Sequence, residues 1–126
     1  MTGKRKKLSF STISSGNGQL KIRGTDLNGS NNCVWGGLLL KCEAADTNSP
    51  WHNFKSDTVN WKAHDGSPLC TNNAGFVKAG GHIPFIKHLL HSGAQKIWTS
   101  HKTVTLIGSP TGGNSISGGG CVFVFF

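Results

Sequence analysis

The chain has 126 residues and 18 glycines, a length that fits one domain with a modest core and a composition typical of β structure with many tight turns. Its 13 Lys and Arg residues outnumber 5 Asp and Glu residues, which gives a formal net charge of +8 and makes nucleic acid, an anionic membrane or an acidic partner a candidate ligand. So few acidic residues argue against catalysis by paired carboxylates, and the sequence contains neither a phosphate-binding loop nor an apolar stretch long enough to cross a membrane as a helix.

The N-terminal end is strongly basic. We expect residues 1–7 to form a solvated tail and residues 8–126 to form a single β-rich domain. As an alternative, the tail could contact the phosphates of nucleic acid or the charges of another polyanion. Four consecutive cations would make this contact: Lys4, Arg5, Lys6 and Lys7.

Alternating apolar and polar residues predict a strand from Leu8 to Ile13 and a second strand from Gln19 to Gly24. Between them, Asn17-Gly18 suits a tight turn, so we expect the two strands to form a hairpin. The second strand alternates two apolar residues with two cations on its opposite face: Leu20, Lys21, Ile22 and Arg23. A further apolar block follows from Cys33 to Cys42.

The cysteines bear on the compartment in which the protein folds. The first ten residues lack the apolar core of a secretory signal, so we expect the protein to be made in the cytoplasm without a signal peptide. In that setting, reduced thiols or metal ligands are favoured over disulfides. The four cysteines are Cys33, Cys42, Cys70 and Cys121.

Only one stretch has convincing helical spacing, and it predicts a short helix at about residues 84–92. Pro84 suits the first helical position, and Gly93 suits the position just past the end. The apolar residues share one face: Phe85, Ile86, Leu89 and Leu90. The predicted fold is therefore a small, mainly β domain with many glycine turns and one short helix.

Histidines cluster in the same part of the chain. His88 and His91, three positions apart, share one face of the predicted helix and could reach one ion together with His101 and Cys70. A single structural zinc or iron ion would suit a small, loop-rich β domain. As an alternative, the histidines form a solvated polar face near the helix C-terminus.

The C-terminal segment combines a β-branched strand at residues 103–107, a Gly-Ser-Pro turn, a small-residue loop and a closing apolar run. We expect the two strands to form a core hairpin. The closing run should lie in the core or against a partner, because it would be adhesive if exposed. Its residues after Cys121 are Val122, Phe123, Val124, Phe125 and Phe126.

Four short segments follow one another in a recognisable order: Gly36 to Cys42, the segment around Cys70, Val104 to Pro110, and the Gly-rich segment before Cys121. They resemble, in turn, the opening strand, the central cysteine loop, the strand and turn, and the closing strand of PAAR-like proteins. Proteins of that family cap the spikes of phage tails, type VI secretion systems and related contractile injection systems. The helix near residues 84–92 is not part of that pattern, and no Pro-Ala-Ala-Arg sequence occurs. The resemblance implies a compact β tip that docks on a trimeric spike, often with one bound metal ion.

Three functions remain open from the sequence. The first is a non-enzymatic tip protein that docks on a trimeric spike or other particle subunits, helps to pierce the target envelope and is carried in a virion or injection particle. The second is a basic module that binds nucleic acid or another polyanion. The third is a small toxin or effector with Cys–His chemistry, although no long helix follows any cysteine, as it does in familiar cysteine hydrolases.

Overall fold

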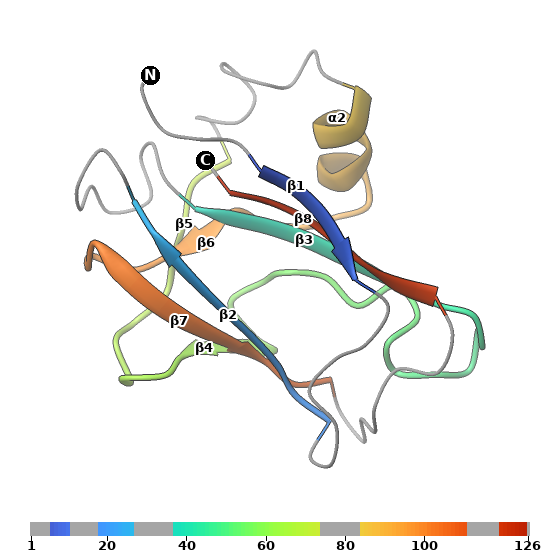
Figure 1. The fold of residues 1–126 in the computed structure, drawn as a ribbon, viewed down its shortest axis with the longest axis horizontal. Coiled ribbons are helices and arrows are strands. Elements are labelled where there is room, and N and C mark those ends of the chain that lie inside the picture. The colour runs from blue at the N-terminus through green and yellow to red at the C-terminus, as the bar shows by residue number, and fades with distance from the viewer. Residues whose placement is uncertain (1–5, 11–17, 27–36, 74–83, 111–118, 126) are drawn as a thin grey trace.

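A computed structural model describes residues 6–10, 18–26, 37–73, 84–110 and 119–125 (Figure 1). Within these ranges the chain is mainly β, with one short helix where helical spacing predicts it. The strands are β1 (Lys6–Phe10), β2 (Leu20–Thr25), β3 (Leu38–Ala44), β4 (Trp61–Ala63), β5 (Cys70–Thr71), β6 (Ile97–Trp98), β7 (Thr103–Gly108) and β8 (Gly119–Phe125). The helix is α2 (Pro84–His91). The predicted fold class is therefore confirmed.

The strands form two antiparallel sheets that lie one above the other in Figure 1. One sheet has five strands in the order β1-β8-β3-β6-β5, and the other has three in the order β2-β7-β4. β1 begins at Lys6 and therefore includes two residues of the predicted tail. In the part of the chain that the structure describes, no helix is long and apolar enough to cross a membrane.

Both predicted hairpins are wrong, because the two strands of each lie in different sheets. β1 pairs with β8 and β2 pairs with β7, so the chain between β1 and β2 crosses from one sheet to the other. The same is true between β7 and β8. The two strands of each predicted hairpin therefore pack their apolar faces against the shared core from opposite sides. The strands of a hairpin within one sheet would pack against it from the same side.

The backbone of the closing apolar run has a central position. β8 pairs with β1 on one side and with β3 on the other, where Leu40 lies opposite Phe123 and Cys42 lies opposite Cys121. Cys121 is fully buried. The side chains of residues 122–126 lie outside what the structure describes, so their predicted core or docking role stays a prediction.

The core lies between the two sheets and is rich in aromatic residues. Trp51 meets Phe54 edge to face at a centroid distance of 5.1 Å, and Phe54 stacks on Trp61 at 5.8 Å. Trp61 lies opposite Gly108 on β7, where an added Cβ would approach the indole to 2.5 Å. Glycine is required at this position because the indole occupies the space of a side chain. Further core residues are Leu20, Ile22, Leu38, Leu40, Ala63, Ile97, Trp98, Val104 and Leu106.

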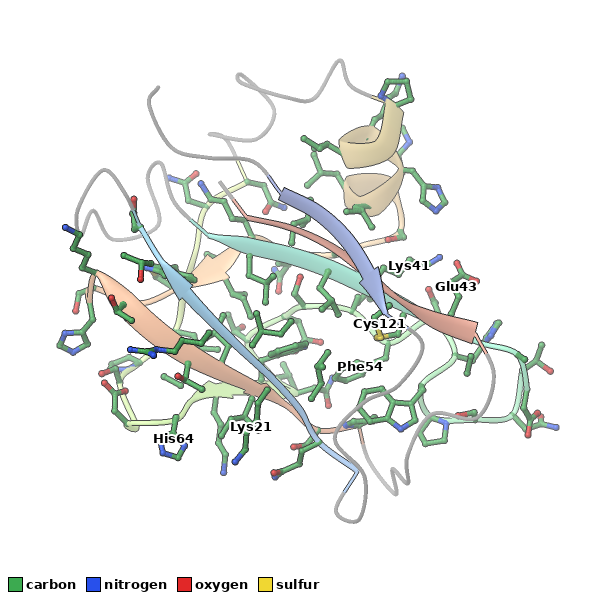
Figure 2. All side chains as sticks on the ribbon, in the orientation of Figure 1. Lys21, Lys41, Glu43, Phe54, His64 and Cys121 are labelled. Atoms are coloured by element: carbon green, nitrogen blue, oxygen red, sulfur yellow. A yellow bond between two sulfur atoms is a disulfide. The ribbon has the colours of Figure 1, made fainter. Side chains whose placement is uncertain are left out.

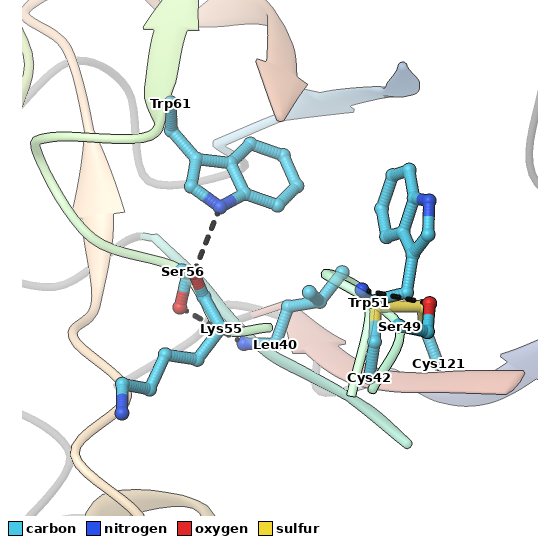
Figure 3. Close-up of a disulfide and its surroundings, with 8 residues drawn as sticks. All are labelled: Leu40, Cys42, Ser49, Trp51, Lys55, Ser56, Trp61 and Cys121. Carbon is cyan, nitrogen blue, oxygen red and sulfur yellow. Dashed lines mark hydrogen bonds between the residues drawn. A yellow bond between two sulfur atoms is a disulfide. The ribbon is translucent and has the colours of Figure 1, made fainter. Parts of the chain in front are cut away.

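The loop before β4 is fastened to β3 by backbone hydrogen bonds and by one buried hydroxyl. Ser56 Oγ accepts a hydrogen bond from the Leu40 backbone N–H at 3.1 Å (Figure 3), and it donates one to the Gln95 carbonyl at 2.7 Å. The Trp61 indole N–H donates to the Lys55 carbonyl at 3.0 Å (Figure 3). These bonds satisfy polar groups that burial would otherwise leave without partners.

Helix α2 covers the other face of the five-stranded sheet. Leu39 points away from the central core because β3 alternates its side chains, and it is fully buried. Ile86 and Leu89 on α2 are buried on this side, and the helix contacts β3. The molecule therefore has three layers, and the outer face of the three-stranded sheet is the side farthest from α2 (Figure 1).

Candidate functional site

The outer face of the three-stranded sheet carries the candidate site, and β2 contributes half of it. Leu20 and Ile22 point into the core, which leaves Lys21 and Arg23 exposed on the opposite face. The sequence pattern predicted that the apolar and the basic side chains of β2 lie on opposite faces. Burial of the two apolar side chains holds the two cations on the outer face. Lys21 projects away from the five-stranded sheet in Figure 2.

Strand β4 contributes the other half by the same alternation. Trp61 and Ala63 are buried in the core, so Lys62 is exposed on the outer face. His64 continues the pairing past the end of the strand, because its backbone N–H donates to the Thr105 carbonyl at 2.8 Å. His64 is exposed and projects to the same side as Lys21 (Figure 2).

The strand register brings these side chains together across β7. Lys21 and Lys62 both lie opposite Ile107, which places them in one row across the sheet. Arg23 lies opposite Thr105, and His64 bonds to the same residue, so they form the next row. Neighbouring strands are about 4.8 Å apart, which places the backbones within a row roughly 10 Å apart. We call Lys21, Arg23, Lys62 and His64 the basic face.

Hydroxyl groups border the basic face. Thr25 and Thr103 are exposed at the end of β2 and the start of β7, and their hydroxyls are hydrogen-bonded to each other at 3.0 Å. Thr105 lies half-buried in the row of Arg23 and His64. The site thus presents positive charge beside neutral groups that can donate and accept hydrogen bonds.

None of the acidic side chains occupies a row of the basic face. Asp26 follows Thr25 but is buried, and Glu43 binds Lys41, whose ammonium lowers the pKa of that carboxyl. Asp65 is held by the Ser67 backbone N–H, which lowers its pKa. The remaining two, Asp46 and Asp57, accept hydrogen bonds from backbone N–H groups of their own turns. The positive charge of the basic face is therefore not neutralised by a carboxylate on the same rows.

A surface pocket of about 290 Å³ beside the loop at residues 50–60 is the main competing site. Its charged groups already have partners within the chain. Asp57 Oδ1 accepts from the Val59 and Asn60 N–H groups, and Lys55 Nζ donates to the Ser92 carbonyl. The pocket therefore offers a ligand fewer open charges than the basic face.

The cysteines that the structure describes are oxidised, and for them the expectation of reduced thiols is wrong. Cys42 and Cys121, directly opposite on β3 and β8, form a disulfide that lies in the same buried cluster as Trp51 (Figure 3). Cys70 is also half of a disulfide, whose partner lies outside the described residues. The prediction of reduced thiols was based on the first ten residues, whereas the bridge depends on strand register. That register brings together two cysteines that are 79 positions apart in the sequence. A cysteine nucleophile would need a thiolate, and the described cysteines have none to offer.

The structure does not assemble the predicted metal site. Cys70 is removed from the set because a disulfide sulfur is not a thiolate ligand. His88 and His91 are exposed on α2, whereas His101 lies 3.9 Å from Asp65, past the end of β6. Among residues that the structure describes, no three potential ligands come together around one ion. The histidine part of the zinc or iron hypothesis stays a prediction.

The predicted polyanion site in the tail is placed only in part. Lys4 and Arg5 lie outside the described residues, while Lys6 and Lys7 pair with Phe125 and Val124 at the edge of the five-stranded sheet. Sequence reasoning placed Lys21 and Arg23 on one strand face but did not connect them with Lys62 and His64. The missing information was the pairing of β2 and β4 with opposite edges of β7.

One further cation lies in the interior of the protein and not on its surface. Lys96 has no exposed surface, and its stem passes so close to Gly37 that a Cβ there would approach Lys96 Cγ to less than van der Waals contact. Burial lowers the pKa of Lys96 to about 8, against the opposing effect of the negative charge on Asp26. The folded protein therefore releases this proton more readily than the unfolded chain does.

Because Lys96 is buried, we predict that the free energy of unfolding rises with pH. Above a pH of about 8 the unfolded chain holds the Lys96 proton and the folded protein does not, so raising the pH toward 10.5 favours folding. The gain should be about 3.5 kcal/mol at most, at about 1.4 kcal/mol for each unit of pKa depression. Urea unfolding between pH 7 and pH 10 measures it. Lys96→Met should flatten the dependence, whereas the exposed Lys87→Met should not. A flat profile for the native sequence would contradict the burial of a charged amine.

Comparison with family models, with curated proteins and with solved structures finds no match to this chain.

Proposed function

We propose that the chain is a non-catalytic module that binds an anionic polymer through the basic face. The observation that carries the proposal is the register of β2 and β4 on β7, which gathers Lys21, Arg23, Lys62 and His64 on two adjacent rows. Arg and Lys bind phosphate and sulfate oxygens through charge-assisted hydrogen bonds. A polymer can bind to several rows at once, so weak single interactions sum to useful affinity.

Catalysis has less support. The described cysteines are in disulfides, and the five acidic residues are dispersed among a buried position, an ion pair and separate turns. In contrast, the basic face is exposed, and it is held rigidly by side chains that anchor the other face of the same strands in the core. Binding requires only such a fixed arrangement of charge.

The particle-tip function predicted from the short motifs is a separate proposal, in which residues near the C-terminal strand dock on a trimeric spike. The motif segments at Gly36 to Cys42, Val104 to Pro110 and Cys121 contribute to β3, β7 and β8, which belong to two different sheets. No described side-chain arrangement favours this proposal over the basic face.

The proposed function is tested by reversing the charges of the basic face. The triple variant Lys21→Glu/Arg23→Glu/Lys62→Glu should weaken binding of a sulfated oligosaccharide or an oligonucleotide by about 100-fold, since each charge-assisted hydrogen bond that it removes is worth on the order of 1 kcal/mol. The slope of log K against log salt, measured by fluorescence titration, should fall by roughly one unit for each cation that no longer binds the polymer.

A matched pair of variants separates the site from net charge. Lys62→Glu and Lys87→Glu change the net charge equally, but Lys87 is exposed on α2, on the far side of the molecule. Only Lys62→Glu should weaken binding. If the triple variant binds as the native sequence does, and removal of residues 1–5 abolishes binding, the tail is the site and the basic face is not.

A further inference from the structure

The first observation concerns the environment in which the basic face acts. Cys42 and Cys121 are cross-linked, and Cys70 is also in a disulfide. Such bonds persist in oxidising environments such as the extracellular space, the secretory lumen, the periplasm and the surfaces of cells and virions, and they are rare where glutathione keeps thiols reduced. The anionic polymers of such environments include glycans that carry sulfate and carboxylate groups.

The second observation is that, among the residues that the structure describes, the basic face has no aromatic side chain for a base to stack on. Trp61 is the aromatic residue of β4, and it points into the core. Trp51 and Trp98 are also buried. Proteins that bind single-stranded nucleic acid rely on exposed aromatic rings, and those that read duplex DNA usually insert a helix or a β-ribbon into a groove. Here α2 lies on the opposite side of the molecule (Figure 1).

The third observation is the mixture of groups on the surface. Exposed hydroxyls of Thr25 and Thr103 lie at the end of the strand that carries Lys21 and Arg23, and Thr105 lies between Arg23 and His64. A sulfated sugar presents the complementary mixture, because sulfate oxygens accept from ammonium and guanidinium groups while ring hydroxyls exchange hydrogen bonds with threonine. A nucleic-acid backbone offers phosphates but far fewer hydroxyls.

From these observations we propose that the polymer bound by the basic face is a sulfated polysaccharide. This inference rests on the proposed function and narrows it to one ligand class. Lys21, Arg23 and Lys62 bind sulfate groups of successive sugars, and Thr25 and Thr103, at the end of β2 and the start of β7, bind sugar hydroxyls. The short spacing along β2, about 7 Å between alternate residues, lets one sugar chain meet two cations on the same strand.

The test is a calorimetric titration of the full chain, with its disulfides intact, at a physiological salt concentration. The probes are a heparin decasaccharide, the same decasaccharide with its sulfates removed and its carboxylates kept, a single-stranded oligonucleotide and a DNA duplex. We expect the sulfated probe to bind at least about tenfold more tightly than either DNA at matched salt, and the desulfated probe to give no measurable binding. Thr25→Val/Thr103→Val should weaken the sulfated probe several-fold and leave DNA binding unchanged.

The possible results separate this inference from the proposed function. If DNA binds as tightly as the sulfated probe and Lys62→Glu weakens both, the ligand class is wrong while the basic face remains the site. If the sulfated probe binds but Lys62→Glu and Lys87→Glu affect it equally, the basic face is not the site and both proposals fail. If no probe binds the native sequence, both proposals also fail. Selective binding that Lys62→Glu weakens and Lys62→Arg retains supports both.

Discussion

A chain that lacks residues 122–126 should fail to fold. β8 would lose most of its length, and with it the pairing that joins β1 and β3 in the middle of the five-stranded sheet. β1 would then have no partner strand and β3 would become an edge, with unpaired backbone groups next to an opened core. The resulting loss of stabilising free energy should exceed the net stability of a domain this size, which is typically about 5–15 kcal/mol.

The expected result is aggregated protein, or soluble protein that shows no cooperative transition on heating. Circular dichroism and calorimetry on material purified in parallel would measure it. Removal of residues 1–5 provides the control, because it shortens the chain equally and leaves every described strand complete. A C-terminal truncation that melts cooperatively near the temperature of the full chain would show that β8 is not central to the fold.

Loss of the Cys42–Cys121 disulfide should cause the next largest effect. The bridge closes a loop between residues 79 apart, and in the chain-entropy model such a link removes about 4–5 kcal/mol of conformational freedom from the unfolded state. Cys42→Ala/Cys121→Ala should therefore lower the free energy of unfolding by about that amount, with some further loss from the space left by two buried sulfurs.

Urea unfolding without reductant would measure this loss. A second variant, Cys42→Val/Cys121→Val, removes the cross-link and refills much of the volume, so comparison of the two variants separates the cross-link from packing. Both should unfold at clearly lower urea concentrations than the native sequence. Native-like stability in both variants would mean that the cross-link does not form in solution.

The sequence pattern succeeded where the information is local. The period of two at Leu20 and Ile22 placed β2, and the spacing of Ile86 and Leu89 placed α2, because each pattern depends only on which residues lie on one face of an element. The closing apolar run also predicted a strand, and its backbone pairs with β1 and β3, whereas the burial of its side chains after Cys121 stays a prediction.

The pattern failed where the information is non-local. Asn17-Gly18 suits a hairpin turn, yet the strands on either side pair with distant segments, and no local signal specifies which sheet a strand joins. The disulfide was missed for the same reason, because Cys42 and Cys121 meet only through the register of β3 on β8. Half of the basic face was visible in β2, but Lys62 joins Lys21 only through their shared neighbour on β7.

The central place of β8 also decides when the protein can fold during its synthesis. β8 leaves the ribosome after all other described strands, yet β1 and β3 have no finished sheet until it arrives. β1 is the first of the described strands to be made and β8 is the last, and the two pair with each other. Their pairing closes a long loop, which costs conformational entropy, and such non-local pairing is slow. We expect a long-lived nascent chain with exposed apolar strands, and hence a dependence on chaperones that a protein built from local hairpins would not have.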